Sequence, residues 1–596
     1  MSGINRRSAL GIGAAGIAAF NVGTLRAEST EPKLKAVVAI NGRTYEFREE
    51  GGTDLGDYVA PGNKFVQRCI RSEVADFPMS VFFRPDRGSD RVEVVFELGR
   101  VFSQSPVNLG AYNVVISRGE HILARVDVPQ HYWFARWRWQ SAPRPIVADA
   151  QELMRYGLLP PYARKTEGPA ADTLNLMPLP SGDYVDLGIV REFTGGNYDN
   201  AAKLLMKAQE FHDKTTGAGA VWAKLSTAQT TYSVMGLAGV RAYMPSTGER
   251  PDIGLVTEPQ AQFIATADQG ALELLMSQAE AAGTMPWHIR DERQNGPFDF
   301  RAYPDATWYF SANAGAPHIK ATETPITIDS AHQPALAYLP FLLTDDPYFL
   351  EELQFQATWN WGSLPAKMRP TGVQTRMIAW NLRTLAQVTR VTQAVTPAWL
   401  LPHSYWIGEL TKHRQWFETN YVNNPSPERQ VFRACGDINN SRDEPLAPGG
   451  TWVDPWQDEF LAAVLGWVIY MGFSDWRPAF NWAIGGTIAR SSQTRGWVRA
   501  FATPYRMILR ETKTAPIASN WAQAWELTRR LTQKTVADPN TWAESDMTYL
   551  TYTRGALVYA DLLGVPEAKE ALAWATQELK KKNWNVAAKW RMGMAV

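Results

Sequence analysis

The sequence predicts a multidomain α+β protein in which an N-terminal antiparallel β-sandwich is followed by six helical hairpins. From about residue 35 to 140, apolar and polar residues alternate with a period near two. Beyond about residue 250, apolar residues recur at helical spacing and the helices come in pairs. First helices are apolar on nearly every side and second helices carry one apolar stripe, so six enclosed helices inside six outer ones are expected to form a double-walled ring.

The β part is expected to contain short strands broken by Gly, Pro and Asp, as in an antiparallel sandwich. Residues 141–250 are rich in Pro and Gly and fit two interpretations, completing the sandwich or wrapping onto the next domain. The predicted strands are 37–40, 44–47, 80–83 and 92–96, with a hairpin of 112–116 and 121–126 that turns at Arg118-Gly119.

The helical part is expected to contain six consecutive pairs. Residues 460–473 carry no charge, as a first helix should, whereas residues 566–582 place charges beside one apolar stripe. The uncharged run is too short to span a membrane, which argues against a membrane bundle, but an open helical solenoid remains an alternative to the ring. The predicted pairs are 256–267 with 270–282, 332–343 with 347–361, 374–391 with 397–420, 455–473 with 475–491, 499–510 with 519–534, and 546–563 with 566–582.

Residues 1–27 are predicted to be a leader. Arg6-Arg7 precedes a weakly apolar run that ends near Ala27, the pattern of a twin-arginine (Tat) signal for export to the periplasm or beyond. Gly11–Gly16 matches G-x-G-x-x-G, but it lacks the preceding strand and following helix that dinucleotide binding needs. After the leader, the sequence predicts a β domain over 30–250 and a helical domain over 251–596, without stable membrane insertion.

Composition excludes several classes of function. Lys+Arg and Asp+Glu are both 60, so the chain lacks the basic excess of a non-specific nucleic-acid binder. Cys69 and Cys435 are the only cysteines, and whether they pair stays open. The eight histidines show no H-E-x-x-H spacing, and neither a nucleophile elbow nor a P-loop occurs, so no metal or cofactor is expected.

An antiparallel β domain followed by six helical hairpins resembles the (α/α)6-toroid carbohydrate-active enzymes, the six-hairpin glycosidases and polysaccharide lyases. The resemblance is architectural and covers residues ~30–596, although segments such as Met285–Glu292 and Asp329–Pro334 look like family signatures. It implies that the protein cleaves a polysaccharide or oligosaccharide at the end of the toroid where the inner helices begin. It leaves the oligomeric state open.

The residues expected at that end form two sets. The catalytic candidates are Asp329, His332, Asp458, Glu459, Asp546 and Tyr549. The substrate-binding candidates are Trp287, His288, Arg290, Arg376, Trp380, Trp452, Trp456, Tyr552 and Arg554.

Two chemistries could use these residues. Glycoside hydrolysis, slightly favoured because carboxylates outnumber bases, needs a carboxyl pair such as Asp458 or Glu459 with Asp329 or Asp546. Lyase β-elimination needs a base, His332 or Tyr549, and an arginine (Arg290, Arg376 or Arg554) to neutralise a uronate carboxylate. A third possibility is a non-catalytic glycan-binding protein with the same aromatic cleft.

Each candidate also has a structural explanation. Asp329 and Asp454 occupy positions typical of helix N-caps, and Asp458 and Glu459 fall in a first turn where acids stabilise the helix dipole. His332 could be a core histidine. Most of the 24 tryptophans follow residue 250 and are expected to fill the core, with Trp287, Trp380, Trp452 and Trp456 set apart as possible sugar-stacking rings.

Overall fold

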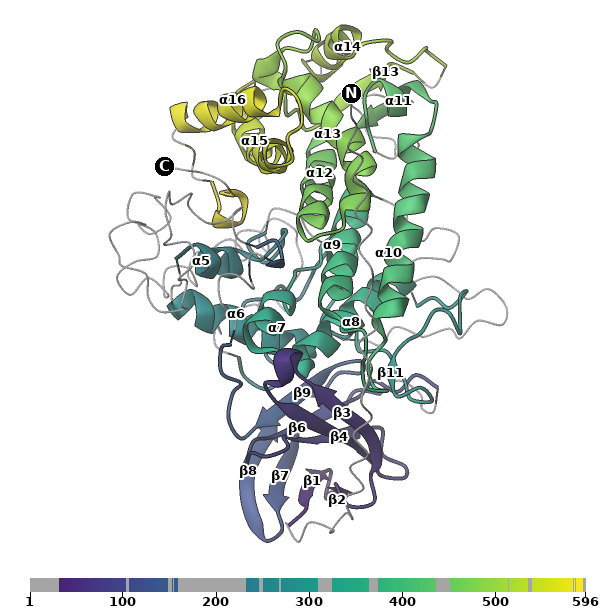
Figure 1. Ribbon diagram of the computed structural model, residues 1–596, viewed down its shortest axis with the longest axis vertical. Coiled ribbons are helices and arrows are strands. Elements are labelled where there is room, and N and C mark those ends of the chain that lie inside the picture. Colours follow the sequence, from purple (N-terminus) through teal and green to yellow (C-terminus); the bar gives the residue numbers. More distant parts are fainter. Residues whose placement is uncertain are drawn as a thin grey trace, which may run out of the picture.

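Figure 1 shows the computed structural model of the protein, an elongated molecule with β-sheets at one end and helices above them. The expected leader, its glycine motif and most of the stretch between residues 148 and 231 lie outside the part of the chain that is described. The structure describes residues 32–102, 107–147, 153, 155–158, 232–245, 250–266, 269–308, 324–363, 374–435, 451–512, 514–533, 539–582, 584 and 586–592.

The N-terminal part of the chain folds into two antiparallel sheets. One has the strand order β2-β1-β7-β8 and the other the order β3-β4-β5-β6-β9. The strands are β1 (Leu34–Ile40), β2 (Arg43–Arg48), β3 (Thr53–Val59), β4 (Val66–Glu73), β5 (Ser80–Pro85), β6 (Val92–Glu97), β7 (Tyr112–Arg118), β8 (His121–Val128) and β9 (Arg136–Gln140).

Alternation along the strands gives the five-stranded sheet two buried faces. Val81 and Phe83 of β5 share one apolar cluster with Ala36 and Val38 of β1, so the two sheets pack against each other on this side. Phe82, between them in sequence, belongs instead to the apolar core of the helical part. The second face of this sheet is therefore the surface on which the helices rest.

The sequence predicted the strands of the first sheet and β5 and β6, but not β3, β4 or β9. The β3 strand contains Gly56 at a register shift, and β4 carries three charged residues. In β9, the charged residues Arg136 and Arg138 suggest a face exposed to solvent, yet both are buried against the helices. Charged side chains that are buried in pairs hide the strand pattern.

The helices make up most of the rest of the described chain, together with two small two-stranded sheets, β10-β11 and β12-β13. The helices are α5 (Glu258–Thr266), α6 (Gln269–Ala281), α7 (Tyr338–Thr344), α8 (Pro347–Gly362), α9 (Thr375–Val391), α10 (His403–Phe417), α11 (Pro427–Gln430), α12 (Pro455–Tyr470), α13 (Arg477–Ser491), α14 (Trp521–Gln533), α15 (Pro539–Leu562) and α16 (Ala568–Lys581). The short strands are β10 (Arg290–Asp291), β11 (Gly296–Pro297), β12 (Thr451–Val453) and β13 (Met507–Arg510).

Five of the six predicted hairpins are present as helices that pack on their sequence neighbours: α5 with α6, α7 with α8, α9 with α10, α12 with α13, and α15 with α16. The fifth prediction is wrong in its first member. Residues 499–510 form a short 3-10 turn and then β13, which pairs with β12. Pro504 lies in the middle of this stretch, where it interrupts a helix.

A closed six-hairpin toroid is not confirmed. Without a fifth inner helix, α12 packs directly on α15 as well as on α9. The crossing is close: a Cβ on Gly466 of α12 would lie 2.4 Å from the Cβ of Tyr559 on α15. The expected outer helix α8 is buried almost throughout, because it lies between the sheet and the other helices.

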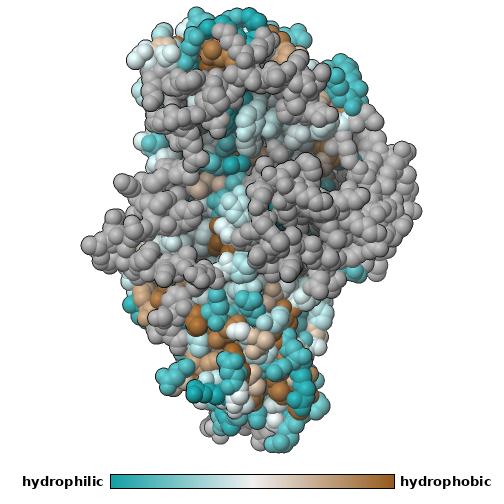
Figure 2. All heavy atoms as spheres, turned by 180° about the vertical axis from the view of Figure 1, so that it is seen from behind, coloured by the Kyte–Doolittle hydropathy of each residue, from teal (hydrophilic) through white to brown (hydrophobic). Residues whose placement is uncertain are grey.

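The surface and the cysteines add two observations. On the face shown in Figure 2, hydrophilic and apolar residues are interspersed over the sheets at the lower end. Within the described ranges, no helix has the length and apolar character needed to cross a membrane. Cys69 and Cys435 are both buried free thiols, so the disulfide that the sequence left open does not form.

Candidate functional site

The centre of the candidate site is a hydrogen-bonded pair, Asp329 and His332, in the loop that precedes α7. The Asp329 side chain accepts the backbone N–H of Ala331 at 3.1 Å and the Nδ1–H of His332. The helix starts only at Tyr338, so Asp329 is not an N-cap and orders a turn instead. Within the described part of the chain, Nε2 of His332 is buried without a hydrogen-bond partner.

The protonation states follow from this geometry. Burial raises the pKa of Asp329, but the hydrogen bond from His332 and other favourable interactions outweigh it and leave the pKa below its usual value. An ionised Asp329 can only accept, so Nδ1 carries the proton and Nε2 presents a lone pair. Burial, opposed by Asp329 and assisted by Arg376, lowers the pKa of His332 to about 4, so the imidazole is neutral at pH 7.

The backbone of His332 is held from outside the loop. Its carbonyl accepts Nη2 of Arg250 at 2.9 Å, and Arg250 in turn pairs through Nε with Asp252 at 3.1 Å. The Nζ of Lys589, from the chain after α16, donates to the carbonyls of Arg250 and Ile253. Three segments distant in sequence thus fix the position of the imidazole.

Arg376, in the first turn of α9, lies next to this pair and affects the pKa of both of its members. Its backbone N–H donates to Oε1 of Gln457 at 3.2 Å, and its Nε donates to Oε1 of Gln374 at 2.8 Å. The guanidinium carbon lies 5.5 Å from the ring centroid of Trp456, in the first turn of α12. The start of α9 therefore brings a cation between the histidine loop and an indole.

Aromatic rings continue the site beyond Arg376. Trp456 stacks on Tyr505 at 6.1 Å and on Tyr549 of α15 at 5.7 Å between centroids. Trp456 is 5% exposed and its indole N–H has no partner among the described residues, whereas Tyr505 is 43% exposed. The site thus runs from a buried histidine toward an open aromatic surface.

The β12–β13 pair adds a second cation. Trp452 lies opposite Ile508 in the pairing, and the guanidinium of Arg506 lies 5.1 Å from the Trp452 ring and 5.4 Å from the Tyr505 ring. Arg506 is also 3.7 Å from Asp454. Asp454 makes no capping hydrogen bond at the start of α12, and instead accepts Nε2 of Gln457 at 3.1 Å.

Asp458 and Glu459 are each hydrogen-bonded to protein groups. Asp458 accepts the backbone N–H of Cys435 at 3.0 Å, and Glu459 pairs with Arg490 at 2.8 Å, and both acids are buried. Burial, partly offset by Arg490, raises the pKa of each to about 7. Both acids follow Trp456 closely in α12, but their hydrogen-bond partners differ from those of His332 and Arg376.

Trp287, His288 and Arg290 also lie elsewhere, within the interface between the five-stranded sheet and α8. Trp287 and His288 both donate to Oε2 of Glu352, at 3.4 and 2.7 Å, and Arg290 pairs with Glu351. All three are fully buried. The charged run that suggested a binding loop is a structural contact between sheet and helix.

The remaining predicted residues are packed away from solvent or not described. Trp380 packs on Phe460 at 5.0 Å, and Tyr552 packs between Phe460 and Trp590. Arg554 is buried and donates through Nη1 to two backbone carbonyls near the end of the described chain. Asp546 belongs to α15, but its side chain lies outside the described residues. The structure therefore brings together Asp329, His332, Arg376, Trp452, Trp456 and Tyr549.

Sequence reasoning missed Gln457, Tyr505 and Arg506. Tyr505 and Arg506 fell inside a predicted inner helix, where a tyrosine and an arginine attract no notice. The prolines around this stretch were the available signal, because they favour a loop or edge strand that can carry exposed side chains.

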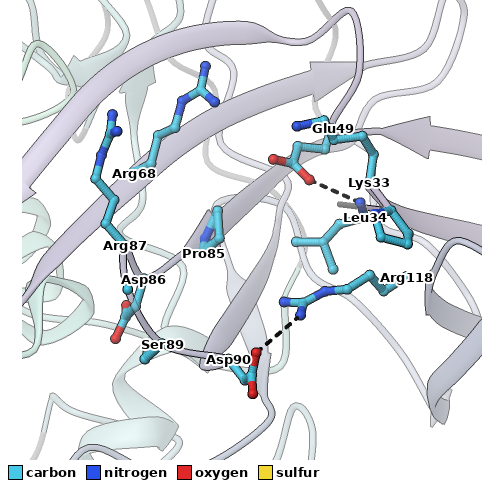
Figure 3. A pocket seen from close by; sticks show the side chains of 12 residues that line it. Lys33, Leu34, Glu49, Arg68, Pro85, Asp86, Arg87, Ser89, Asp90 and Arg118 are labelled. Atoms are coloured by element: carbon cyan, nitrogen blue, oxygen red, sulfur yellow. Dashed lines mark hydrogen bonds and ion pairs between the residues drawn. The ribbon is translucent and has the colours of Figure 1, made fainter. Parts of the chain in front are cut away.

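Two other features of the described residues bear on ligands. No group of three or more His, Cys, Asp or Glu side chains there could hold a metal ion. A pocket of about 490 Å³ lies on the sheets, where Figure 3 shows Arg118 reaching toward Asp90. Its other arginines have acidic partners too, Arg68 with Asp54 and Arg87 with Asp57, so the pocket shows no strong excess of either charge.

No protein-family model, no curated protein and no solved structure matches this chain.

Proposed function

We propose that this protein cleaves a uronate-containing glycan by β-elimination, with His332 as the base and Arg376 as the group that holds the uronate carboxylate. The observation that carries the proposal is the Asp329–His332 pair, because Nε2 of His332 has no hydrogen-bond partner among the described residues and the charge of Arg376 lowers the pKa of this imidazole. The Arg6-Arg7 leader makes export to the periplasm or beyond part of the same proposal.

The side chains suit the bonds that change in such a reaction. The base takes the proton from the carbon beside the carboxylate. The electron pair of the broken C–H bond becomes the new carbon–carbon double bond, and the glycosidic C–O bond breaks so that the oxygen leaves. Arg376 stabilises the negative charge that builds on the carboxylate, an effect that is strong in a water-poor site. The leaving oxygen needs a proton, which the hydroxyl of Tyr549, a neighbour of the same indole, can supply.

Binding of the substrate would also assist the base. Arg376 lowers the pKa of His332, and a bound carboxylate would neutralise that effect. The rings of Trp452 and Tyr505 offer flat apolar faces for sugars, and the buried indole N–H of Trp456 offers a donor for a hydroxyl.

Glycoside hydrolysis is the second candidate, because the raised pKa values of Asp458 and Glu459 would suit a general acid. The geometry favours elimination over it. Each of these acids is already bonded to the protein, Asp458 to a backbone N–H and Glu459 to Arg490, and neither contacts the aromatic rings of the site in the described interactions.

The test is incubation of the purified protein with uronate-containing and neutral polysaccharides. β-Elimination produces a conjugated double bond that absorbs ultraviolet light, whereas hydrolysis produces new reducing ends without that absorbance. Hydrolysis would overturn the proposed mechanism, and binding without any product would leave a glycan-binding protein.

The first prediction concerns His332. In His332→Gln the base is lost, so we expect kcat/KM for elimination to fall by about 10²–10⁴-fold while the protein stays folded. The matched control, His121→Gln on the exposed end of β8, should keep full activity. Because the pKa of His332 is about 4, kcat/KM of the parent should be independent of pH on the acid side down to about pH 5. Unchanged elimination by His332→Gln would exclude this base.

A further inference from the structure

The candidate site contains two arginines that each lie over an indole. Arg376 lies over Trp456 at 5.5 Å, and Arg506 lies over Trp452 at 5.1 Å. Arg506 and Trp452 come from the β12–β13 pair, so this second cation is supplied by elements other than those that supply the first. An aromatic face beside a guanidinium provides both a platform for a sugar ring and a partner for its carboxylate.

The two arginine–indole pairs are joined to each other. The ring of Tyr505 stacks on Trp456 and also lies 5.4 Å from the Arg506 guanidinium. A polar chain runs beside it, from the backbone N–H of Arg376 through Gln457 to Asp454 and so to Arg506. The two pairs are therefore neighbouring positions of one surface.

Asp454 is an acidic neighbour of Arg506. Its contact with Arg506 is 3.7 Å long and partly exposed to water, and it shares its carboxylate with Gln457. Ion pairs of this kind contribute little energy. A substrate carboxylate that reaches Arg506 directly can make the shorter, bidentate contact that guanidinium groups favour.

We propose that Arg506, Trp452 and Tyr505 form a second acidic-sugar subsite, so that the protein prefers glycans with carboxylates on consecutive sugars to glycans in which uronates alternate with neutral sugars. This proposal rests on the proposed function for its substrate, and it adds the arrangement of acid groups along that substrate. In an alternating glycan, the sugar next to the uronate bound by Arg376 is neutral, so a second arginine has no carboxylate to bind.

The experiment compares Arg506→Gln with the parent on two probes of equal length, a homo-oligouronide and an oligosaccharide with uronate at every second sugar. On the homo-oligouronide we expect Arg506→Gln to raise KM about tenfold with kcat changed less than about twofold, and Arg506→Lys to recover part of the loss. On the alternating probe, KM should not change. The control is Arg495→Gln, which removes an exposed arginine paired with Glu567 and should affect neither probe.

Calorimetric binding separates failure of this proposal from failure of the proposed function. In the His332→Gln background, the homo-oligouronide should bind about tenfold more weakly once Arg506→Gln is added, whether or not the parent shows turnover. Equal effects of Arg506→Gln on both probes, or none on either, would overturn the second subsite. Absence of elimination by the parent, with the binding difference retained, would overturn only the proposed reaction.

Discussion

Burial sets the charge of two carboxyl groups in the first turn of α12. Glu459 pairs with Arg490, whose charge also favours ionised Asp458, yet loss of water outweighs that attraction and raises the pKa of each acid to about 7. The sequence placed these acids correctly at a helix start. It could not show that they turn inward, because the residues that cover them, Cys435 and Arg490, come from segments outside that helix.

The second prediction is a pH dependence of stability. The pKa values of both acids are higher in the folded protein than in the unfolded chain, so the folded state holds protons that the unfolded chain releases between about pH 4 and 7. The free energy of unfolding should therefore fall as pH rises through this window, by up to about 1.4 kcal/mol per pH unit for each carboxyl, and level off above it.

Thermal unfolding between pH 4.5 and 8 tests this dependence. The double variant Asp458→Asn, Glu459→Gln removes both titrating groups, so its Tm should fall less across the window than that of the parent. Asp90→Asn, whose side chain is fully exposed, serves as the control and should keep the parent slope. A double variant with an unaltered slope would show that other groups cause it.

At the scale of elements, the contact between α8 and the five-stranded sheet is ionic. Glu351 on α8 pairs with Arg84 of β5, Arg136 of β9 and Arg290 of β10. Beside it, Glu352 pairs with Arg136. These side chains are completely buried, so each depends on its partners for the interactions that water would otherwise supply.

The third prediction follows for Glu351→Gln. Removal of this charge leaves three buried guanidinium groups short of a carboxylate, and we expect a loss of about 3–5 kcal/mol in the free energy of unfolding. Urea denaturation measures it. Glu526→Gln, which breaks an exposed pair with Arg529, is the matched control and should cause no measurable change. A small effect of Glu351→Gln would mean that its neighbours, such as Glu97, replace it.

The elements also show where prediction from sequence works. The apolar run of 460–469 and the stripe of α16 predicted helices that the structure contains, because local periodicity alone decides such segments. The predictions for β9 and for residues 499–510 failed because local periodicity does not decide the structure of these segments. Arg136 is buried against Glu352 of α8, and Arg138 is buried against Glu280 of α6 and Asp346, which precedes α8. Strand β13 forms by pairing with β12. None of these partners is visible in a local pattern.

At the scale of the whole molecule, residues 586–592 connect α5, near the start of the helical part, to α15, near its end. A 3-10 turn at Ala588–Trp590 packs on both α5 and α15. Glu258 accepts the backbone N–H groups of Ala588 and Lys589, and Arg554 on α15 donates to the carbonyl of Trp590. Periodicity predicted paired helices but not this link, since no helical pattern marks it.

The fourth prediction tests the link through Lys589. Lys589→Met keeps the apolar stem but removes the donor to the carbonyls of Arg250 and Ile253. We expect faster amide hydrogen exchange in α5 and the 250–256 segment, with the two sheets unchanged, because the link touches only one end of the helical part.

Activity gives a second readout for the same variant. Arg250 supports the His332 backbone, so Lys589→Met should lower kcat with little change in KM. Lys582→Met, at the exposed end of α16, is the control. Unchanged exchange in α5 would show that the other contacts of the link are sufficient.

The contact between Lys589 and Arg250 joins residues 339 positions apart in the chain. At a translation rate of ~5–20 residues per second, the lysine is added roughly 20 to 70 seconds after the arginine that it holds. A ribosome-bound chain therefore carries Arg250 and His332 long before the support for them exists. Completion of the candidate site is therefore coupled to completion of the helical part, and a chain that ends before Lys589 lacks this support for the His332 loop.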